Sequence, residues 1–337
     1  MTQANLHEAI LWESVSGGNI RCMACAHRCV ISLDKHGICG TRKNIKGGFF
    51  STVYEFPIAV HVDPIEKKPL FHFLPGSKTM SIGTAGCNFK CSFCQNFEIS
   101  QMRGDSLSGQ ALSINDLLDN AQATGCESIA YTYNEPVVFL EYVLDTAQAA
   151  HQRGIKNVYI SNGFESEESI QLLTGNIDAM NIDLKAFTDN FYLKLCKGRL
   201  DPVLENIHKA YENGIWIEIT TLLIPGANDS DQEIRAMAAF IASVSKNIPW
   251  HLSRFFPSFK MTDVPPTPLS RLERARKIGL EEGLHFVYVG NVPKESNTTY
   301  CPQCDEILIV RDGYQISQRH FKDGHCLHCG LSIPGIY

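Results

Sequence analysis

The most constraining feature of this sequence is a loop with three cysteines at short, unequal spacings. Cys87, Cys91 and Cys94 form a CxxxCxxC arrangement, and Cys126 follows only after a long segment rich in Ser, Gly and Gln. Ferredoxin clusters are usually closed by four cysteines and transfer only electrons. Three thiolates at these spacings can bind three irons of a 4Fe-4S cluster and leave the fourth iron open. A zinc loop or unrelated core thiols are the alternative, but zinc sites usually supply paired CxxC units.

Four further cysteines near the start of the chain indicate a second metal-binding module. They are Cys22, Cys25, Cys29 and Cys39, in a segment rich in glycine and basic residues. Four thiolates bind either a structural zinc ion or an iron–sulfur cluster, and spacing alone separates the two poorly. We therefore expect zinc or a second iron–sulfur cluster in this module, with zinc the preferred of the two.

The last cysteines of the chain form two CxxC pairs. A strand-like apolar run at 306–310 lies between the pairs. This pattern is typical of a zinc ribbon or a rubredoxin-like site. We expect zinc in a structural role, and a docking or nucleic-acid-binding tail is the less favoured alternative. The predicted ligands are Cys301, Cys304, Cys326 and Cys329.

Between the outer cysteine groups, apolar runs alternate with amphipathic segments, as in the βαβ units of a parallel sheet. Six to seven such units fall short of the eight of a complete barrel. The predicted fold class is α/β: a partial (β/α)6-type barrel at 76–293, flanked by small cysteine-rich metal modules at 1–75 and 294–337. Strands are expected at 79–83, 128–132, 157–161, 179–184, 215–222, 250–254 and 286–289. Helices are expected at 113–124, 136–152, 166–173, 201–213, 230–245 and 269–282.

Polar residues directly follow several of these strands. Because a parallel barrel builds its site at the carboxyl ends of its strands, these side chains are expected to surround one pocket. A ligand with a sulfonium, an amino group, a carboxylate, a ribose and an adenine needs such acceptors, a cation and small turns. Taken singly, each of these polar residues could instead have a structural role as a helix cap, a turn residue or part of a surface ion pair. The residues are Asn134, Glu135, Ser161, Asn162, Asp183 and Lys185.

The central region resembles the activating enzymes of pyruvate formate-lyase type within the radical S-adenosylmethionine (SAM) superfamily. The loop 86–96 is similar to that family's cluster loop almost position for position, including Phe93 before the last cysteine. Glu135 and the proline after it stand where the family has Gly-Gly-Glu-Pro. Tyr133 and Asn134 replace the two glycines, so the local approach of the backbone is expected to differ.

This resemblance implies a 4Fe-4S cluster and SAM as cofactors. Glu135 is then expected to accept the SAM amino group, and Asp183 with Lys185 to lie near the methionine moiety. Ser161 and Asn162 correspond to a turn close to the ribose. By the same resemblance, Asn134 and Phe93 are expected to belong to the cofactor-binding set, and Cys87, Cys91 and Cys94 to bind the cluster.

Over nearly its full length the chain looks like the radical SAM enzymes of the AmmeMemoRadiSam system. The resemblance includes the N-terminal cysteine module, the segments 63–75, 131–136, 191–205 and 250–257, and the terminal CxxC pairs. It implies partnership with a Memo-like and an Ammecr-like protein. It does not assign a substrate or an overall reaction.

The charge pattern limits the other partners. The 30 Lys and Arg against 36 Asp and Glu give a formal charge of -6, without long runs of like charge. Nonspecific nucleic-acid binding is therefore disfavoured. The sequence has no apolar stretch long enough for a membrane helix and no signal-peptide pattern at its start, so a cytoplasmic protein is expected.

Together these features predict an enzyme that reductively cleaves SAM to a 5'-deoxyadenosyl radical, which abstracts hydrogen from a substrate. An external electron donor would supply the electron. Cys196 is predicted to face the substrate, although a cysteine on a helix is more often a core residue. Activation of a glycyl-radical enzyme is one alternative. A metal-stabilised module for binding RNA or protein, with an inert barrel, is another.

Overall fold

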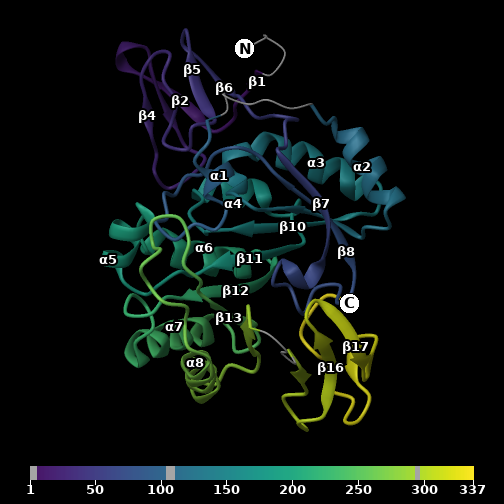
Figure 1. The fold of residues 1–337 in the computed structure, drawn as a ribbon. Helices are drawn as coiled ribbons and strands as arrows, with labels where there is room; N and C mark the ends of the chain where they lie inside the picture. The colour runs from purple at the N-terminus through teal and green to yellow at the C-terminus, as the bar shows by residue number, and fades with distance from the viewer. Residues whose placement is uncertain (1–5, 104–110, 293–296) are drawn as a thin grey trace.

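The computed structural model describes residues 6–103, 111–292 and 297–337, and its centre is an eight-stranded sheet. The strands are β7 Ala59–Pro64, β8 Lys78–Gly83, β9 Ser128–Tyr131, β10 Lys156–Ser161, β11 Ala179–Asp183, β12 Trp216–Leu223, β13 Trp250–Arg254 and β14 Val287–Gly290. Their order is β14-β13-β12-β11-β10-β9-β8-β7 (Figure 1). Strands β8 to β14 pair in parallel in chain order, which is the layout of an open α/β barrel.

The connections between the parallel strands contain helices. These are α1 Phe97–Ser100, α2 Ile114–Ala123, α3 Leu140–Gln152, α4 Glu167–Leu173, α5 Asp189–Phe191, α6 Asp201–Glu212, α7 Asp231–Val244 and α8 Leu269–Glu281. Ser113, Ser166 and Ser230 cap α2, α4 and α7, because each hydroxyl accepts a hydrogen bond from the backbone N–H three residues later. The predicted α/β fold class is confirmed. Within the described ranges, no helix has the length and apolar character that crossing a membrane requires.

Strand β7 belongs to the sheet, although the predicted division places it in the N-terminal module. It pairs antiparallel with β8, in a register that runs from Ala59 opposite Gly83 to Pro64 opposite Lys78. Val60 and Val62 are 38% and 41% exposed, because β7 is the edge strand. A short edge strand with little buried surface carries a weak apolar signal. The predicted boundary between 293 and 294 lies outside the described residues.

The N-terminal module consists of two small antiparallel sheets. One contains β2 Trp12–Val15, β3 Asn19–Cys22 and β4 Val30–Ile31, and the other β1 His7–Glu8, β6 Gly48–Ser51 and β5 Arg42–Ile45. Arg42 anchors this module to the barrel, since its Nη2 lies 2.5 Å from Oε1 of Glu141 on α3. Both side chains are only 2% exposed. A buried pair of this kind is costly to break, because the remaining charge is left without a partner.

The C-terminal module packs against the barrel near the amino ends of its strands. Its strands are β15 Thr299–Tyr300, β16 Ile307–Asp312, β17 Gln315–Arg319, β18 Phe321–Lys322 and β19 His325–Cys326. Arg311 is buried and donates from Nη2 to the Phe71 carbonyl at 2.7 Å. The chain end adds two backbone hydrogen bonds, from Leu74 N to Ile336 O at 2.7 Å and from Ile336 N to His72 O at 2.8 Å. Figure 1 shows the two outer modules at opposite ends of the molecule.

Candidate cluster and cofactor site

The loop that follows β8 contains the three closely spaced cysteines. Cys91 is buried, and Cys87 and Cys94 are partly exposed. The Phe89 N–H donates to Cys87 Sγ at 3.4 Å, and Ser100 Oγ lies 3.3 Å from Cys94 Sγ. Burial raises the pKa of Cys87 and of Cys94, and the charge of Glu135 raises the pKa of Cys87 further. Hydrogen bonds to cysteine sulfurs and burial are both means by which proteins tune iron–sulfur clusters.

Two segments from elsewhere in the chain hold this loop in place, and one of them contains the predicted site residue Cys196. Two backbone carbonyls of the π-helical turn Tyr192–Cys196 accept hydrogen bonds from the cysteine loop. Lys90 N donates to Cys196 O at 2.8 Å, and Ser92 N donates to Leu195 O at 2.9 Å. From the loop after β13, Lys260 N donates to Ser92 O at 3.0 Å. These are backbone contacts, which carry no residue-specific signal, so no sequence motif could have revealed them.

Asn134 forms a clamp between β9 and the cysteine loop. Its Nδ2 donates to the Gly86 carbonyl at 2.7 Å, and its Oδ1 accepts from Thr84 N at 3.2 Å. Tyr133 before it has a φ of 70°, a left-handed conformation that glycine adopts more readily. Tyr133 therefore supplies a left-handed turn, and Asn134 adds a side chain that braces the loop.

Glu135 lies in a buried carboxyl pair with Glu165. Its Oε2 accepts from Asn162 N at 2.8 Å, and its Oε1 accepts from Val137 N at 3.3 Å. Ser161 Oγ bridges the pair, at 3.0 Å from Glu135 Oε1 and 2.5 Å from Glu165 Oε1. Burial raises the pKa of Glu135 well above its ordinary value, the Glu165 charge raises it further, and burial also raises the pKa of Glu165. Two carboxyls this close share a proton, because both cannot ionise without a cation.

Asn162 connects this pair to the cysteine loop. Its Nδ2 donates to Asn88 Oδ1 at 2.7 Å, and Asn88 directly follows Cys87. The backbone N–H of Asn162 donates to Glu135 at the same time. The predicted residues after β9 and β10 are thus joined to the loop after β8 in one hydrogen-bonded network.

Asp183 and Lys185 form an ion pair at the end of β11. Lys185 Nζ lies 2.6 Å from Asp183 Oδ2, and the Lys185 side chain is 14% exposed against 38% for Asp183. Burial alone would lower the pKa of Lys185, but the charge of Asp183 and its hydrogen bond hold it well above the usual lysine value. Lys185 therefore stays cationic beside Cys91 and leaves part of the Asp183 carboxylate accessible to a ligand.

Phe93 and Cys196 both lie in the core rather than on an open surface. Phe93 is 5% exposed and packs on Phe191, with ring centroids 5.7 Å apart. Cys196 is 0% exposed. A hydrogen bond with Cys196, together with burial, raises the pKa of Cys91 well above its ordinary value, so the two sulfurs are neighbours. Contact of Cys196 with a substrate remains a prediction.

The four C-terminal cysteines form a compact group. Cys301 Sγ lies 3.6 Å from Cys329 Sγ, and Cys304 Sγ lies 3.8 Å from Cys326 Sγ. All four sulfurs lie within 4.8 Å of one another. Four thiolates bound to one ion at the Zn–S distance of about 2.3 Å would be about 3.8 Å apart. The group therefore has the dimensions of a site for a single tetrahedral ion.

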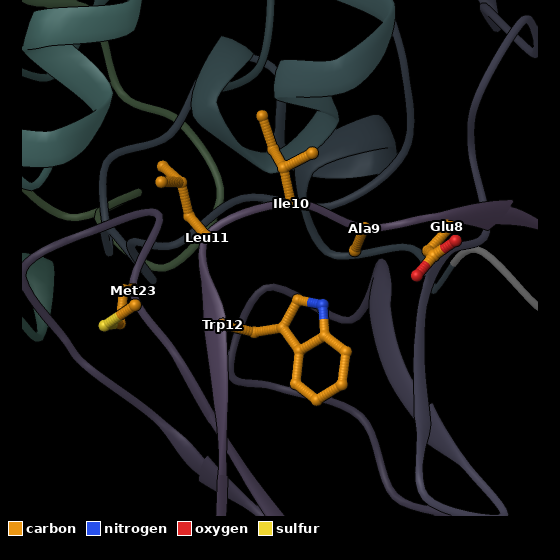
Figure 2. Close-up of a pocket in the computed structure, with 6 residues that line it drawn as sticks. All are labelled: Glu8, Ala9, Ile10, Leu11, Trp12 and Met23. Carbon is orange, nitrogen blue, oxygen red and sulfur yellow. The ribbon is translucent and has the colours of Figure 1, made fainter.

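The four N-terminal cysteines line one shared pocket. Its lining also includes Arg42 and Asn88. A separate, open hollow lies on the same module, lined by Glu8, Ala9, Ile10, Leu11, Trp12 and Met23 (Figure 2). None of the predicted site residues lines that second hollow.

Comparison with known proteins identifies the superfamily of this chain. The family described as the radical SAM superfamily matches residues 81–238. An uncharacterized protein of Methanocaldococcus jannaschii is 41% identical over 97% of this chain and 99% of its own length. The chain belongs to the radical SAM superfamily. The matched residues begin in β8 and include the cysteine loop and the strand-end residues after β9, β10 and β11.

More distant radical SAM proteins are also similar to this chain. The pyruvate formate-lyase-activating enzyme of Clostridium pasteurianum is 24% identical over 50% of this chain and 71% of its own length. The structure of a radical SAM methyltransferase from Sphaerobacter thermophilus gives a TM-score of 0.50 at 16% identity, covering 65% of this chain and 67% of that one. The methyltransferase shares the fold alone. These likenesses support the prediction of a radical SAM enzyme, and the substrate is a separate question.

Proposed function

We propose that this enzyme cleaves SAM reductively at a 4Fe-4S cluster bound by Cys87, Cys91 and Cys94, and that the resulting 5'-deoxyadenosyl radical abstracts hydrogen from a substrate. The observation that carries the proposal is the joining of the three-cysteine loop to polar residues at three successive strand ends. The cluster, once reduced, supplies the electron for cleavage. The chain supplies thiolates, orientation and a closed environment.

The side chains fit this cofactor pair. The Phe89 N–H and the Ser100 hydroxyl lie within hydrogen-bond reach of two of the cysteine sulfurs. Near Cys91, the partly exposed Asp183 carboxylate offers an acceptor for a ligand ammonium, and Lys185 offers a cation for a ligand carboxylate. Lys185 and Asp183 thus suit the methionine end of SAM.

Glu135 remains our proposed acceptor for the SAM amino group. Its carboxylate already accepts two backbone N–H groups and is 2% exposed. Glu135→Ala removes both the acceptor and the brace on Asn162, whereas Glu135→Gln keeps the volume and one acceptor oxygen. We expect Glu135→Ala to weaken SAM binding at least about tenfold, which corresponds to about 1.4 kcal/mol. Unchanged affinity in both variants would assign the amino group to another acceptor.

The direct test is anaerobic reconstitution with iron and sulfide, followed by dithionite and SAM. We expect 5'-deoxyadenosine from the wild-type protein and none from the Cys87→Ala/Cys91→Ala/Cys94→Ala variant. The Cys126→Ala variant, which alters a buried cysteine outside all three groups, serves as the matched control and should retain activity. Cleavage by the triple variant would contradict the cluster assignment.

Activation of a glycyl-radical enzyme is the second candidate function. It is favoured by the similarity to the activating enzymes of pyruvate formate-lyase and of benzylsuccinate synthase, each 24% identical over part of the chain. A glycyl-radical enzyme from the same genome, mixed with the reconstituted protein and SAM, should then acquire a glycyl radical detectable by electron paramagnetic resonance (EPR). A genome without such an enzyme would eliminate this candidate.

We further propose a Memo-like and an Ammecr-like protein as partners, on the resemblance to the AmmeMemoRadiSam system. An external one-electron donor is required in addition, because each cleavage consumes an electron. Co-purification of tagged protein with the two candidates, repeated with a variant that lacks residues 297–337, would test the partnership and the part that the C-terminal module has in it.

A further inference from the structure

The N-terminal cysteines line a pocket and do not converge on a single metal position. Cys22, Cys25, Cys29 and Cys39 all line the same pocket. Among the described residues, the C-terminal cysteines are the only group of three or more candidate ligands with all ligand atoms within 4.8 Å of one another. The N-terminal sulfurs are therefore not gathered as they would be around a single zinc ion, where they would lie about 3.8 Å apart. In a 4Fe-4S cluster each cysteine binds a different iron, so the sulfurs lie farther apart.

Two buried hydrogen-bond donors beside this pocket have no partner. Asn88 Nδ2 and Arg42 Nε are both buried without a hydrogen bond, and the two residues line the pocket. Each residue is only 1% exposed. An unpaired buried donor is costly, so native structures seldom retain one without reason. A cluster offers sulfide and thiolate acceptors where a closed zinc site offers only its four thiolates.

Two other polar groups lie close to the cysteine sulfurs, although their shorter hydrogen bonds go to the carbonyls of Val138 and Ile10. Thr41 Oγ1 lies 3.3 Å from Cys39 Sγ, and Arg42 Nη1 lies 3.9 Å from Cys22 Sγ. A buried guanidinium next to the sulfurs stabilises negative charge there. Both a positive charge and hydrogen bonds to sulfur favour the reduced state of an iron–sulfur cluster.

The pocket adjoins the loop of the SAM cluster. Asn88 lines the pocket and directly follows Cys87, whose Sγ lies 3.7 Å from Asn88 Oδ1. His27 Nε2 donates to the Asn88 carbonyl at 2.9 Å. A Cβ on Gly86 would come within 2.5 Å of the Cys39 carbonyl oxygen, so the backbones of the two cysteine segments are in direct contact.

We propose that Cys22, Cys25, Cys29 and Cys39 bind a second 4Fe-4S cluster, closed by four thiolates, that passes single electrons to the neighbouring SAM cluster. An external low-potential donor reduces the second cluster by one electron, and this electron then reduces the SAM cluster. No covalent bond forms or breaks in the transfer. The relay rests on the proposed function, whereas the presence of the second cluster does not.

The cluster is tested in the Cys87→Ala/Cys91→Ala/Cys94→Ala variant, which lacks the SAM cluster. After anaerobic reconstitution we expect about four irons and four sulfides per chain, and a reduced EPR signal that SAM does not change. Substituting Cys25 and Cys29 by Ala in the same variant should remove that iron. Zinc at the C-terminal site reports that each variant is folded. A folded triple variant that binds zinc at the N-terminal cysteines, or no iron there, overturns the proposal.

The relay is tested in the Cys25→Ala/Cys29→Ala variant with the SAM cluster intact. We expect reduction of the SAM cluster by a flavodoxin-type protein donor to slow at least about tenfold relative to wild type. Reduction by dithionite, a small diffusible reagent, should change less. The relay is overturned if the variant slows reduction of the SAM cluster equally with both reductants, or slows it with neither. If the triple variant binds iron but the wild-type protein forms no 5'-deoxyadenosine, the second cluster is supported and the proposed function is rejected.

Discussion

The two outer modules each carry four cysteines, yet they present their sulfurs in different ways. The C-terminal sulfurs gather within 4.8 Å of one another, while the N-terminal sulfurs line a pocket. The C-terminal group consists of two CxxC turns that face each other within one small module. The N-terminal group is spread over a longer segment, and Asn88 from the barrel forms part of its lining. Cysteine number alone therefore does not determine which metal centre a module can hold.

The modules also differ in how they are joined to the barrel. The N-terminal module contributes Arg42 to a buried ion pair with Glu141. The C-terminal module contributes Arg311, which donates to the Phe71 carbonyl and lies 3.6 Å from Glu66. Each arginine is an anchor, but only Arg42 also touches a cysteine sulfur. Substitutions at the cysteines, the arginines and their neighbours should therefore affect the two modules differently.

The largest effect is expected from removing the C-terminal metal ligands. Cys301→Ala with Cys326→Ala should eliminate one zinc per chain and leave the module exposed to limited proteolysis. Structural zinc in small modules supplies about 10–16 kcal/mol of apparent binding free energy, so the loss is large. Elemental analysis should show the iron content unchanged, and Cys126→Ala should change neither metal. Iron that tracks Cys301 and Cys326 would identify a rubredoxin-like site instead.

The second largest effect is expected at the two buried arginines. Arg42→Met leaves Glu141 as an unpaired buried carboxylate, which should cost about 3–5 kcal/mol of unfolding free energy. The Arg42→Met/Glu141→Met double variant should recover much of that loss. Chemical denaturation measures the unfolding free energy of the single and the double variant.

Arg311→Met is the matched change at the other module. It should loosen the C-terminal module while the N-terminal iron content stays at the wild-type level, whereas Arg42→Met should lower that iron content. Equal loss of iron in the two variants would contradict the separation of the modules.

A smaller contrast is expected between two glycines. Gly86 has a φ of 85°, and a Cβ there would meet the Cys39 carbonyl at 2.5 Å. Gly330 follows Cys329 with a φ of 75° but has open space around it. Gly330→Ala should cost about 1–2 kcal/mol for the left-handed backbone alone. Gly86→Ala should cost more and separate the two cysteine segments, seen as a lower iron content. Similar unfolding free energies would show that the contact at Gly86 relaxes easily.

The smallest effect is expected from pH, at the carboxyl pair beneath the N-terminal module. Cys25 forms a backbone bridge to Glu165, so the pair lies under the docked cysteine loop. The pKa of Glu135 and of Glu165 is raised on folding, so their stabilising contribution is present below the unfolded glutamate pKa and is lost as pH rises through the folded values. A tenfold difference in proton affinity between the folded and unfolded states corresponds to about 1.4 kcal/mol. Glu165→Gln should flatten this decline, measured by denaturation between acidic and neutral pH. An unchanged pH profile would show that the pair does not share a proton.

Much of the barrel and part of the site could be predicted from sequence. The parallel strands appear as apolar runs because both of their faces are covered. The residues Asn134, Asn162 and Lys185 were located because they follow such runs, and all three contact the cysteine loop or its surroundings. Strand β7 was missed because it lies at the edge, where burial leaves little pattern.

Several roles depended on contacts that no motif encodes. Glu165 became part of the site only because β10 and the following turn bring it within 2.5 Å of Ser161 Oγ. The turn Tyr192–Cys196 holds the cysteine loop through backbone carbonyls. Cys196, which the sequence suggested would face a substrate, lies buried beside Cys91.

Three properties of this protein follow from the order of its amino acids alone: the superfamily, the succession of the parallel strands and their helices, and the three sets of cysteines. Local spacing suffices for these, because apolar periodicity and short ligand motifs depend on neighbouring residues. Which cysteines converge on a point and which surround a pocket is instead a property of the folded chain. That distinction depends on the distances among the cysteines between Cys22 and Cys39 and on the Asn88 side chain from the barrel, which long-range packing sets. Spacing along a chain limits how far apart two sulfurs can lie, and folding sets the distance.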